Sequence, residues 1–238
     1  MTDSPRDALT LSEKAKSIVE RWREVEYAGV KVSYKQRLDG GGSTFGQDYI
    51  KWLTALGMPR QRRVFEWCSG PAFIGFSMLA HGLCDTLFLA DINPWAVEAC
   101  RRTLQRNGLA GRVTVIHSDN LDQVPPNERF DLVVGNPPHF IDRLEGNLRA
   151  FDKDWALHKR FYRDIGRFLT PATGVCLIQE NAEGSKTSDF KQMISDGGLD
   201  LIHDGFGQTP VGCNPRFYYV GSVPHGATPP AWLPRQPA

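Results

Sequence analysis

The sequence predicts an α/β protein with a doubly wound, mostly parallel sheet of seven strands. From Arg63 onward, short apolar segments alternate with segments of helical periodicity. Strands that are buried on both faces and separated by helices are typical of parallel sheets. Small or polar residues follow the first four of these strands, at the edge where such sheets bind ligands. A chain of 238 residues is long enough for one domain of this kind.

Residues 1–59 are predicted to form helices joined by a glycine-rich loop. In residues 10–28, Ile18, Val19, Trp22 and Val25 fall on one face of a helix. The stretch LDGGGSTFG follows, and then a second short helix, QDYIKWLTALG, ends at its last glycine.

Residues 60–222 are predicted to form the sheet and its covering helices. The first five strands are VFEWCS, TLFLADI, VTVIHSD, FDLVVGN and GVCLIQEN, and LDLIHDGF and RFYYVGSV form a closing hairpin. Helices are expected in PAFIGFSMLAHG, in NPWAVEACRRTLQRNG and around residues 158–169 and 188–196. In the second of these, Asn93 is the N-cap, Pro94 the first helical residue and Gly108 the residue past the end. The proline-rich residues 223–238 are expected to carry no fold of their own.

The composition is that of an ordinary cytoplasmic protein. The formal net charge is +1, so no strong field attracts nucleic acid or an anionic membrane. The five cysteines are widely spaced and contain no C-x-x-C pair, which predicts neither a disulfide framework nor a zinc site. No apolar stretch is long enough to span a membrane, and the charged first 22 residues do not resemble a signal peptide. No metal site is expected.

The first two strand ends carry residues that suit a nucleotide. Small residues at Cys68, Gly70 and Ala72 allow the chain to turn tightly and approach a ligand, although any turn from a strand into a helix favours small residues. Asp91 ends the next strand, about 20 residues later, where nucleotide-binding sheets place a carboxylate for the ribose hydroxyls. An aspartate at this place could instead interact with the N-terminus of the next helix.

The third and fourth strand ends complete the pattern. Asp119 and Asn120 follow the third strand, where a carboxylate can accept from the amine of adenine. The fourth strand ends in Asn136-Pro137-Pro138-His139, whose prolines fix two φ angles and remove two donors. An isolated Asn-Pro-Pro is typical of a surface turn, but four such strand ends in one sheet together indicate a nucleoside site.

On these residues, over about 60–222, the sequence resembles the class I S-adenosylmethionine-dependent methyltransferases. It is most similar to the branch with an N-P-P-Y motif, which includes release-factor glutamine and adenine-N6 methyltransferases. The resemblance implies a Rossmann-like fold with an N-terminal lid and S-adenosylmethionine as cofactor. It implies that Glu66 and the turn through Cys68, Gly70 and Ala72 hold the methionine part, Asp91 with Ile92 the ribose side, and Asp119 with Asn120 the adenine.

Asn136 and the Pro137 carbonyl are then implied to hold a substrate nitrogen. Methyl transfer from a sulfonium requires the nitrogen lone pair to be aligned with the methyl group, and two fixed acceptors can hold the N–H groups of a planar nitrogen. The sequence departs from the family pattern because Cys68 and Ala72 replace two glycines and His139 replaces the aromatic residue. Histidine can stack as an aromatic ring does, or it can accept a proton.

The substrate is expected to be a small molecule or peptide, with nucleic acid unlikely, because no separate recognition domain is evident and the net charge is near zero. The acidic residues 142–154 would suit a cationic substrate, but they are also typical of a solvated helix face. The residues expected to close the site are Phe45, Gln47, Asp48 and Tyr49 from the lid and Glu180 with Asn181 after the fifth strand.

Other functions fit parts of the pattern. A small, covered site could let the cofactor's own amine attack, giving a cyclase that forms azetidine-2-carboxylate and methylthioadenosine. Protein-glutamine or nucleic-acid adenine-N6 methylation follows from the wider branch. A nicotinamide dehydrogenase would use the turn and Asp91, but the G-x-G-x-x-G spacing is not met. A non-catalytic subunit that only binds the cofactor is a further alternative.

Overall fold

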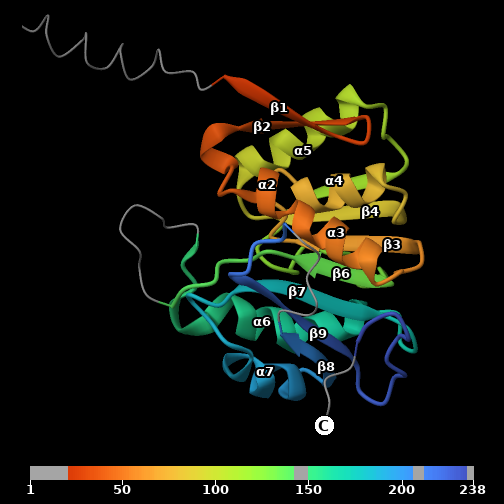
Figure 1. The fold of residues 1–238 in the computed structure, drawn as a ribbon, viewed down its shortest axis with the longest axis vertical. Helices are drawn as coiled ribbons and strands as arrows, with labels where there is room; N and C mark the ends of the chain where they lie inside the picture. The colour runs from red at the N-terminus through yellow and green to blue at the C-terminus, as the bar shows by residue number, and fades with distance from the viewer. Residues whose placement is uncertain (1–20, 142–149, 206–211, 235–238) are drawn as a thin grey trace, which may run out of the picture.

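The computed structural model describes residues 21–141, 150–205 and 212–234. They form a seven-stranded sheet with the order β5-β4-β3-β6-β7-β9-β8, and β3 to β7 are parallel, which confirms the predicted α/β architecture. Figure 1 shows the strands from β4 near the top of the view to β8 at the bottom. The closing pair β8 and β9 is antiparallel, as predicted.

The elements of this domain follow the predicted order. The strands are β3 (Gln61–Trp67), β4 (Cys84–Asp91), β5 (Val113–His117), β6 (Leu132–Gly135), β7 (Val175–Asn181), β8 (Leu199–Gly205) and β9 (Phe217–Pro224). The α-helices are α2 (Gly42–Phe45), α3 (Gln47–Ala55), α4 (Phe73–Ala80), α5 (Pro94–Arg106), α6 (Ala156–Ile165) and α7 (Lys191–Asp196). Short 3-10 helices occupy Gln36–Leu38, Lys153–Trp155, Gly166–Phe168 and Thr187–Asp189.

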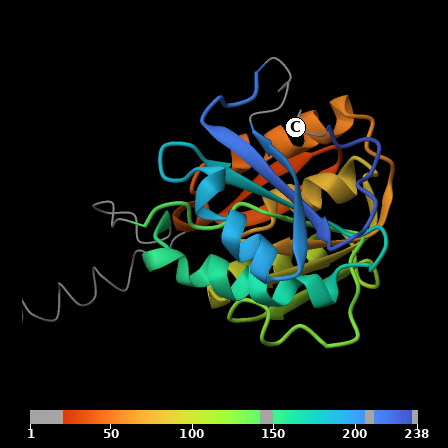
Figure 2. The ribbon, with the colours of Figure 1, turned by 90° about the horizontal axis from the view of Figure 1, so that it is seen from below.

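Two hydrophobic cores cover the two faces of the sheet, because alternate residues of each strand point to opposite sides. On β3, Val64 belongs to one core and Phe65 to the other. The first core contains side chains from α3 and α4, and the second contains side chains from α6 and α7. Figure 2 shows α6 and α7 on one side of the sheet and α3 and α4 on the opposite side. The carboxyl ends of the parallel strands are left open between these layers.

The start of α5 has the predicted capping. The Asn93 side-chain oxygen accepts a hydrogen bond of 3.0 Å from the Trp95 N–H, and Pro94 is the first helical residue. Gly108 follows the helix with a φ of 63°, in the left-handed region that glycine adopts readily.

The N-terminal region differs from the prediction. Instead of a helix over residues 10–28, the described part of that segment forms the strand β1 (Trp22–Tyr27), which pairs antiparallel with β2 (Val30–Lys35). Ala28 and Gly29 connect the strands with φ angles of 42° and 89°, as a tight hairpin turn requires. Residues 10–20 lie outside the described part of the chain. The hairpin packs on α5, where the Thr103 hydroxyl oxygen accepts a buried hydrogen bond of 2.9 Å from the Ser33 N–H.

The C-terminal segment is also more ordered than expected. Residues 225–234 run back along the sheet, and Leu233 is buried in the first core. The Pro234 carbonyl accepts a hydrogen bond from Nδ1 of His203, on β8. The described part of this segment contains turns but no helix or strand, and it packs against the domain.

No helix in the described segments has both the length and the apolar character required to cross a membrane.

The hairpin contact predicts a stability effect. Thr103→Val keeps the side-chain shape but removes the acceptor of the buried Ser33 N–H, so the free energy of unfolding should fall by about 1–3 kcal/mol. Urea unfolding measures it. Thr114→Val, on the exposed face of β5, is the matched control and should change stability by no more than about 0.5 kcal/mol. An equal, small effect of both changes would contradict the buried contact between β2 and α5.

Candidate active site

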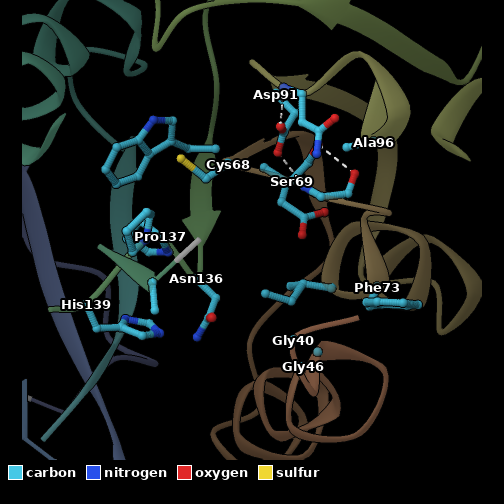
Figure 3. Close-up of a pocket in the computed structure, with 18 of the residues that line it drawn as sticks. Gly40, Gly46, Cys68, Ser69, Phe73, Asp91, Ala96, Asn136, Pro137 and His139 are labelled. Carbon is cyan, nitrogen blue, oxygen red and sulfur yellow. Dashed lines mark hydrogen bonds between the residues drawn. The ribbon is translucent and has the colours of Figure 1, made fainter. Parts of the chain in front are cut away.

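A cavity of about 650 Å³ opens at the carboxyl ends of β3, β4, β5 and β6. This volume is typical of pockets that hold an organic cofactor. Figure 3 shows Asn136, Pro137 and His139 on one side of the cavity and Ser69 and Asp91 on the other. The sequence-predicted residues that line it are Phe45, Glu66, Cys68, Gly70, Asp91, Ile92, Asp119, Asn120, Asn136, Pro137, His139 and Asn181.

The turn after β3 has an unusual backbone. Cys68, Gly70 and Ala72 have φ angles of 51°, 53° and 60°, in the left-handed region. This conformation costs nothing for glycine but about 1–2 kcal/mol for a residue with a Cβ atom. Cys68 and Gly70 line the cavity, whereas Ala72 does not. Ala72 is buried and its N–H donates to the Ser69 carbonyl, so it shapes the turn instead of contacting a ligand.

Asp91 connects the second strand end to this turn. One carboxylate oxygen accepts from the Gly70 N–H and the other from the Asn93 N–H, each at 2.7 Å (Figure 3). Burial raises the pKa of Asp91, and the two N–H donors offset only part of that effect.

Glu66 lies deeper, on β3. It is buried, and its Oε2 accepts from the Gly75 N–H at 2.8 Å. Burial raises its pKa to about 8, because this N–H and that of Ile74 compensate only part of the lost hydration. A Cβ atom at Gly75 would lie 2.5 Å from Glu66 Oε2, so glycine is required for this close approach.

At the third strand end, the two residues predicted to contact adenine, Asp119 and Asn120, have different partners. Both carboxylate oxygens of Asp119 accept from Arg160, at 3.1 and 3.2 Å. Asn120 is buried and donates from Nδ2 to the Leu157 carbonyl. Its Oδ1 is also buried but has no hydrogen-bond partner among the described residues. An unpaired buried acceptor is costly, so this oxygen suits a donor brought by a ligand.

Asn136 follows β6 and is oriented by its neighbours. Its Nδ2 donates to Oε1 of Gln179 at 2.7 Å, and Nε2 of Gln179 donates to the Tyr219 hydroxyl at 3.1 Å. With the amide nitrogen turned toward Gln179, Oδ1 is the Asn136 atom left to accept from a molecule in the cavity. Gln179 was missed in the sequence. The β6–β7 register pairs Gly135 with Ile178. The residues that follow them, Asn136 and Gln179, therefore lie next to each other.

The residues after β7 are arranged differently from the expectation. Asn181 lines the cavity, but Glu180 is fully buried and does not. Its carboxylate lies between the rings of His139 and His158. Burial alone would raise the pKa of Glu180, but the charge on His158 and the hydrogen bonds with both rings outweigh burial and lower it. His158 and Asp152 also belong to this buried group, although the acidic residues of the segment 142–154 were expected to suit a cationic substrate or to lie on a solvated helix face.

Of the four residues predicted to form the lid, Phe45 lines the cavity and the other three do not. Phe45 lines the cavity and packs against Phe217 with ring centroids 4.5 Å apart. Gln47 instead accepts from the Ser77 hydroxyl, and Asp48 accepts from the Asn214 N–H. The Tyr49 hydroxyl is buried against the carbonyl oxygens of Gly135 and Leu177. All three side chains are therefore held by contacts within the domain.

Sequence reasoning also missed cavity residues far from any motif. Asn214, Arg216 and Phe217 line the cavity from the segment that leads into β9. No local pattern in the sequence singles them out, because their position depends on the antiparallel insertion of β9 between β7 and β8.

A seven-stranded sheet of this order, with a nucleoside-sized cavity at the ends of its parallel strands, defines a class I methyltransferase fold. The family model named Methyltransferase small domain matches residues 36–156. The chain belongs to this family of S-adenosylmethionine-dependent methyltransferases.

Curated relatives and solved structures agree with this assignment. The chain is 36% identical over 98 residues to ribosomal RNA small subunit methyltransferase C of Klebsiella pneumoniae, a match that covers 41% of this chain and 27% of the relative. It is 30% identical over 110 residues to the release factor glutamine methyltransferase of Clostridium acetobutylicum, covering 44% and 39%. The chain thus matches well under half of the length of either relative.

A solved structure shares the fold. The T. thermophilus 16S rRNA N2 methyltransferase (RsmC), in complex with AdoMet and guanosine, superposes with a TM-score of 0.59 at 15% sequence identity. The match covers 86% of this chain and 50% of that one.

These comparisons correct the expected partner. A small-molecule or peptide substrate, with nucleic acid unlikely, was inferred from the near-zero net charge, but the relatives include ribosomal RNA methyltransferases and a complex with guanosine. Net charge is a sum over the whole surface and does not report the local charge around one cavity. The relatives give no support to the cyclase alternative.

S-adenosylmethionine is the cofactor of this family, and the residues present fit it. The cavity has sufficient volume, Asp91 lies at the second strand end, and the buried Oδ1 of Asn120 lacks a donor. Ile92 lines the same cavity with 60% of its surface exposed, which leaves an apolar face for a ring to cover.

The buried carboxyl of Glu66 predicts a pH dependence of stability. Its pKa rises from an ordinary 4.5 to about 8 in the folded protein, so the folded state holds a proton that the unfolded state releases in this range. The free energy of unfolding should therefore fall as pH rises from about 4.5 to about 8, by an amount on the order of a few kcal/mol.

Glu66→Gln keeps the acceptor for Gly75 and should remove this loss, which urea unfolding at pH 5 and pH 8.5 measures. Glu98→Gln, at an exposed position of α5, is the control and should follow the wild type. Parallel pH curves for the wild type and Glu66→Gln would contradict a protonated Glu66.

Proposed function

We propose that this chain transfers a methyl group from S-adenosylmethionine to the exocyclic amine of a base in RNA, with guanine N2 as the first candidate. We place it in the N-P-P branch of the class I methyltransferases, with His139 at the position of the usual aromatic residue. The observation that carries the proposal is the orientation of Asn136, whose amide nitrogen is occupied by Gln179 and whose oxygen is left for the substrate.

The cofactor is assigned to the side of the cavity formed by β3, β4 and β5. Asp91 accepts from the ribose hydroxyls, and Glu66 with the Cys68–Gly70 turn surrounds the methionine part. Asn120 Oδ1 accepts from the adenine amine and Ile92 covers the ring, whereas Asp119 acts by holding Arg160. When bound, S-adenosylmethionine supplies an electrophilic methyl group on a sulfonium.

The substrate nitrogen is assigned to Asn136 and Pro137. The Asn136 Oδ1 and the Pro137 carbonyl accept the two N–H groups of an exocyclic amine, which fixes the direction of its lone pair. Gln179 and Tyr219 hold the Asn136 amide in place from behind, so the acceptor is positioned before the substrate arrives.

The residues at the mouth of the cavity favour a nucleic-acid base as the substrate. Phe45 and Phe217 stand together at the cavity, and aromatic rings are the usual surfaces on which unpaired RNA bases stack. Arg216 lines the same cavity with its side chain 64% exposed; its Nε pairs with Glu183 at 3.2 Å, and the exposed guanidinium can contact a phosphate through its other nitrogens. The ribosomal RNA relatives agree with this acceptor.

Asn136→Ala tests the nitrogen clamp. It should lower the turnover number by about 100-fold or more, because the amine loses one of two acceptors that align it. Its affinity for S-adenosylmethionine, measured by calorimetry, should stay within a few-fold of wild type. Asn127→Ala, in an exposed loop, should leave both quantities unchanged. Normal turnover by Asn136→Ala would overturn the proposed clamp.

The acceptor is tested with radiolabelled S-adenosylmethionine and three substrates: unmodified ribosomal RNA, free guanosine and a total protein fraction. Label that is recovered in N2-methylguanosine after nuclease digestion of the RNA would support the proposal. Label found in glutamine of the protein fraction, with none in RNA, would overturn it.

A further inference from the structure

Four side chains form a hydrogen-bonded chain behind the nitrogen clamp. Oδ2 of Asp152 lies 2.6 Å from Nδ1 of His158, and Nε2 of His158 lies 3.0 Å from Oε1 of Glu180. Oε2 of Glu180 lies 3.3 Å from Nδ1 of His139. All four residues are buried, and His158 and Glu180 are completely so. We call this group the Asp152–His139 chain.

Three parts of the fold hold the Asp152–His139 chain rigidly. The Asp152 carboxylate also accepts from the N–H groups of Leu157 and His158 at the start of α6. The His158 ring stacks on Phe190, with centroids 4.9 Å apart and planes at 24°. Glu180 is fixed on β7, next to Gln179, which orients Asn136.

The two carboxylates of the Asp152–His139 chain determine the charge of His158. Burial alone would lower the pKa of His158, but the carboxylates of Glu180 and Asp152 outweigh it and raise that pKa to about 9. His158 is therefore a cation at neutral pH, and it lies between the carboxylates of Asp152 and Glu180. The Glu180 carboxylate lies against His139 as well as His158, so it would stabilise a positive charge formed on either ring.

Only the His139 end of the chain lines the cavity. Because Nδ1 faces Glu180, Nε2 is the nitrogen left for a molecule in the cavity. Figure 3 shows the His139 ring beside the Asn136 side chain, on the same side of the cavity. The same side of the cavity therefore holds an acceptor for the amine and a base next to it.

We propose that Nε2 of His139 accepts the proton that the substrate nitrogen releases on methylation, and that Asp152, His158 and Glu180 are positioning residues that fix its tautomer and balance its charge. The inference rests on the proposed function. The nitrogen lone pair forms the new C–N bond while the S–CH₃ bond breaks and its electrons stay on sulfur. The methylated nitrogen is then positively charged; one of its two N–H protons leaves its acceptor in the clamp and passes to Nε2 of His139, whose Nδ1–H already donates to Glu180.

A stacking role alone does not account for these partners. Buried carboxylates and imidazoles are costly to keep even when they are paired. A purely aromatic side chain would provide the stacking surface at position 139 without Glu180, His158 or Asp152. A proton-accepting role for His139 gives a function to every residue of the Asp152–His139 chain.

Kinetics on the RNA substrate separate the two roles of His139. His139→Phe keeps a flat ring but no base, and His139→Ala removes both; each should lower kcat by about 100-fold or more, with KM within a few-fold. Added imidazole should restore part of the turnover of His139→Ala. Glu180→Gln and His158→Gln should lower kcat by at least tenfold at unchanged cofactor affinity. His225→Ala, at an exposed site on the far edge, should behave as wild type.

A measurement without substrate keeps this inference separate from the acceptor. In protein labelled with ¹⁵N-histidine, the His158 ring should be doubly protonated at pH 7, and the neutral His139 ring should carry its proton on Nδ1. Glu180→Gln should abolish the doubly protonated state of His158. A neutral His158 at pH 7, or full turnover by His139→Phe, would overturn the proposal. The expected ¹⁵N spectra together with no methylation of RNA would overturn the proposed acceptor and support the charge arrangement.

Discussion

The parallel pairing of β6 with β7 is the constraint on which the rest of the site depends. This register places Asn136, the residue after β6, beside Gln179 on β7. Three residues further along the chain, His139 meets Glu180, which follows Gln179 on β7. In both contacts, one residue comes from the segment that follows β6 and the other comes from β7. A slip of one residue would send every side chain on β6 to the opposite face of the sheet and separate both pairs. The buried Tyr49 hydroxyl secures this pairing, because it contacts the carbonyl oxygens of Gly135 and Leu177, one on each strand.

Much of the fold could be predicted because its signals are local. Apolar strands, the Asn93 cap and the polar residues at strand ends are all visible within short windows of sequence. The N-terminal hairpin could not be predicted in the same way, since Trp22 and Val25 are three residues apart, a spacing that places both on one face of a helix but on opposite faces of a strand. The left-handed Ala28 decides in favour of the hairpin, and alanine gives little sign of that conformation. The sequence around Tyr49 predicts a helix correctly, but it does not say which neighbour the helix covers.

The site residues also fall into two groups: those that a local sequence signal marks, and those that only the fold brings together. Asp91, Asn120 and Asn136 were predicted as site residues because a motif or a strand end marks each of them, and all three line the cavity. Asp152 and His158 lie in a segment of mixed charge that is equally typical of a solvated surface, and they meet Glu180 only after α6 packs on the sheet. The expected partner was wrong for a related reason. A sum of charges over the chain contains no information on how Arg216, Phe217 and Phe45 are arranged around one cavity.

The turn after β3 has the left-handed backbone that is usually associated with glycine, but two of its three left-handed positions are not glycine. Cys68 and Ala72 hold the left-handed angles that glycine adopts freely, and the turn keeps its shape around the Gly70 N–H that Asp91 accepts. A search pattern written as three glycines would therefore pass over this chain. A pattern written as three small residues at alternate positions after an apolar strand would include it. Cofactor sites of this architecture can thus be more widespread than a glycine-based signature indicates.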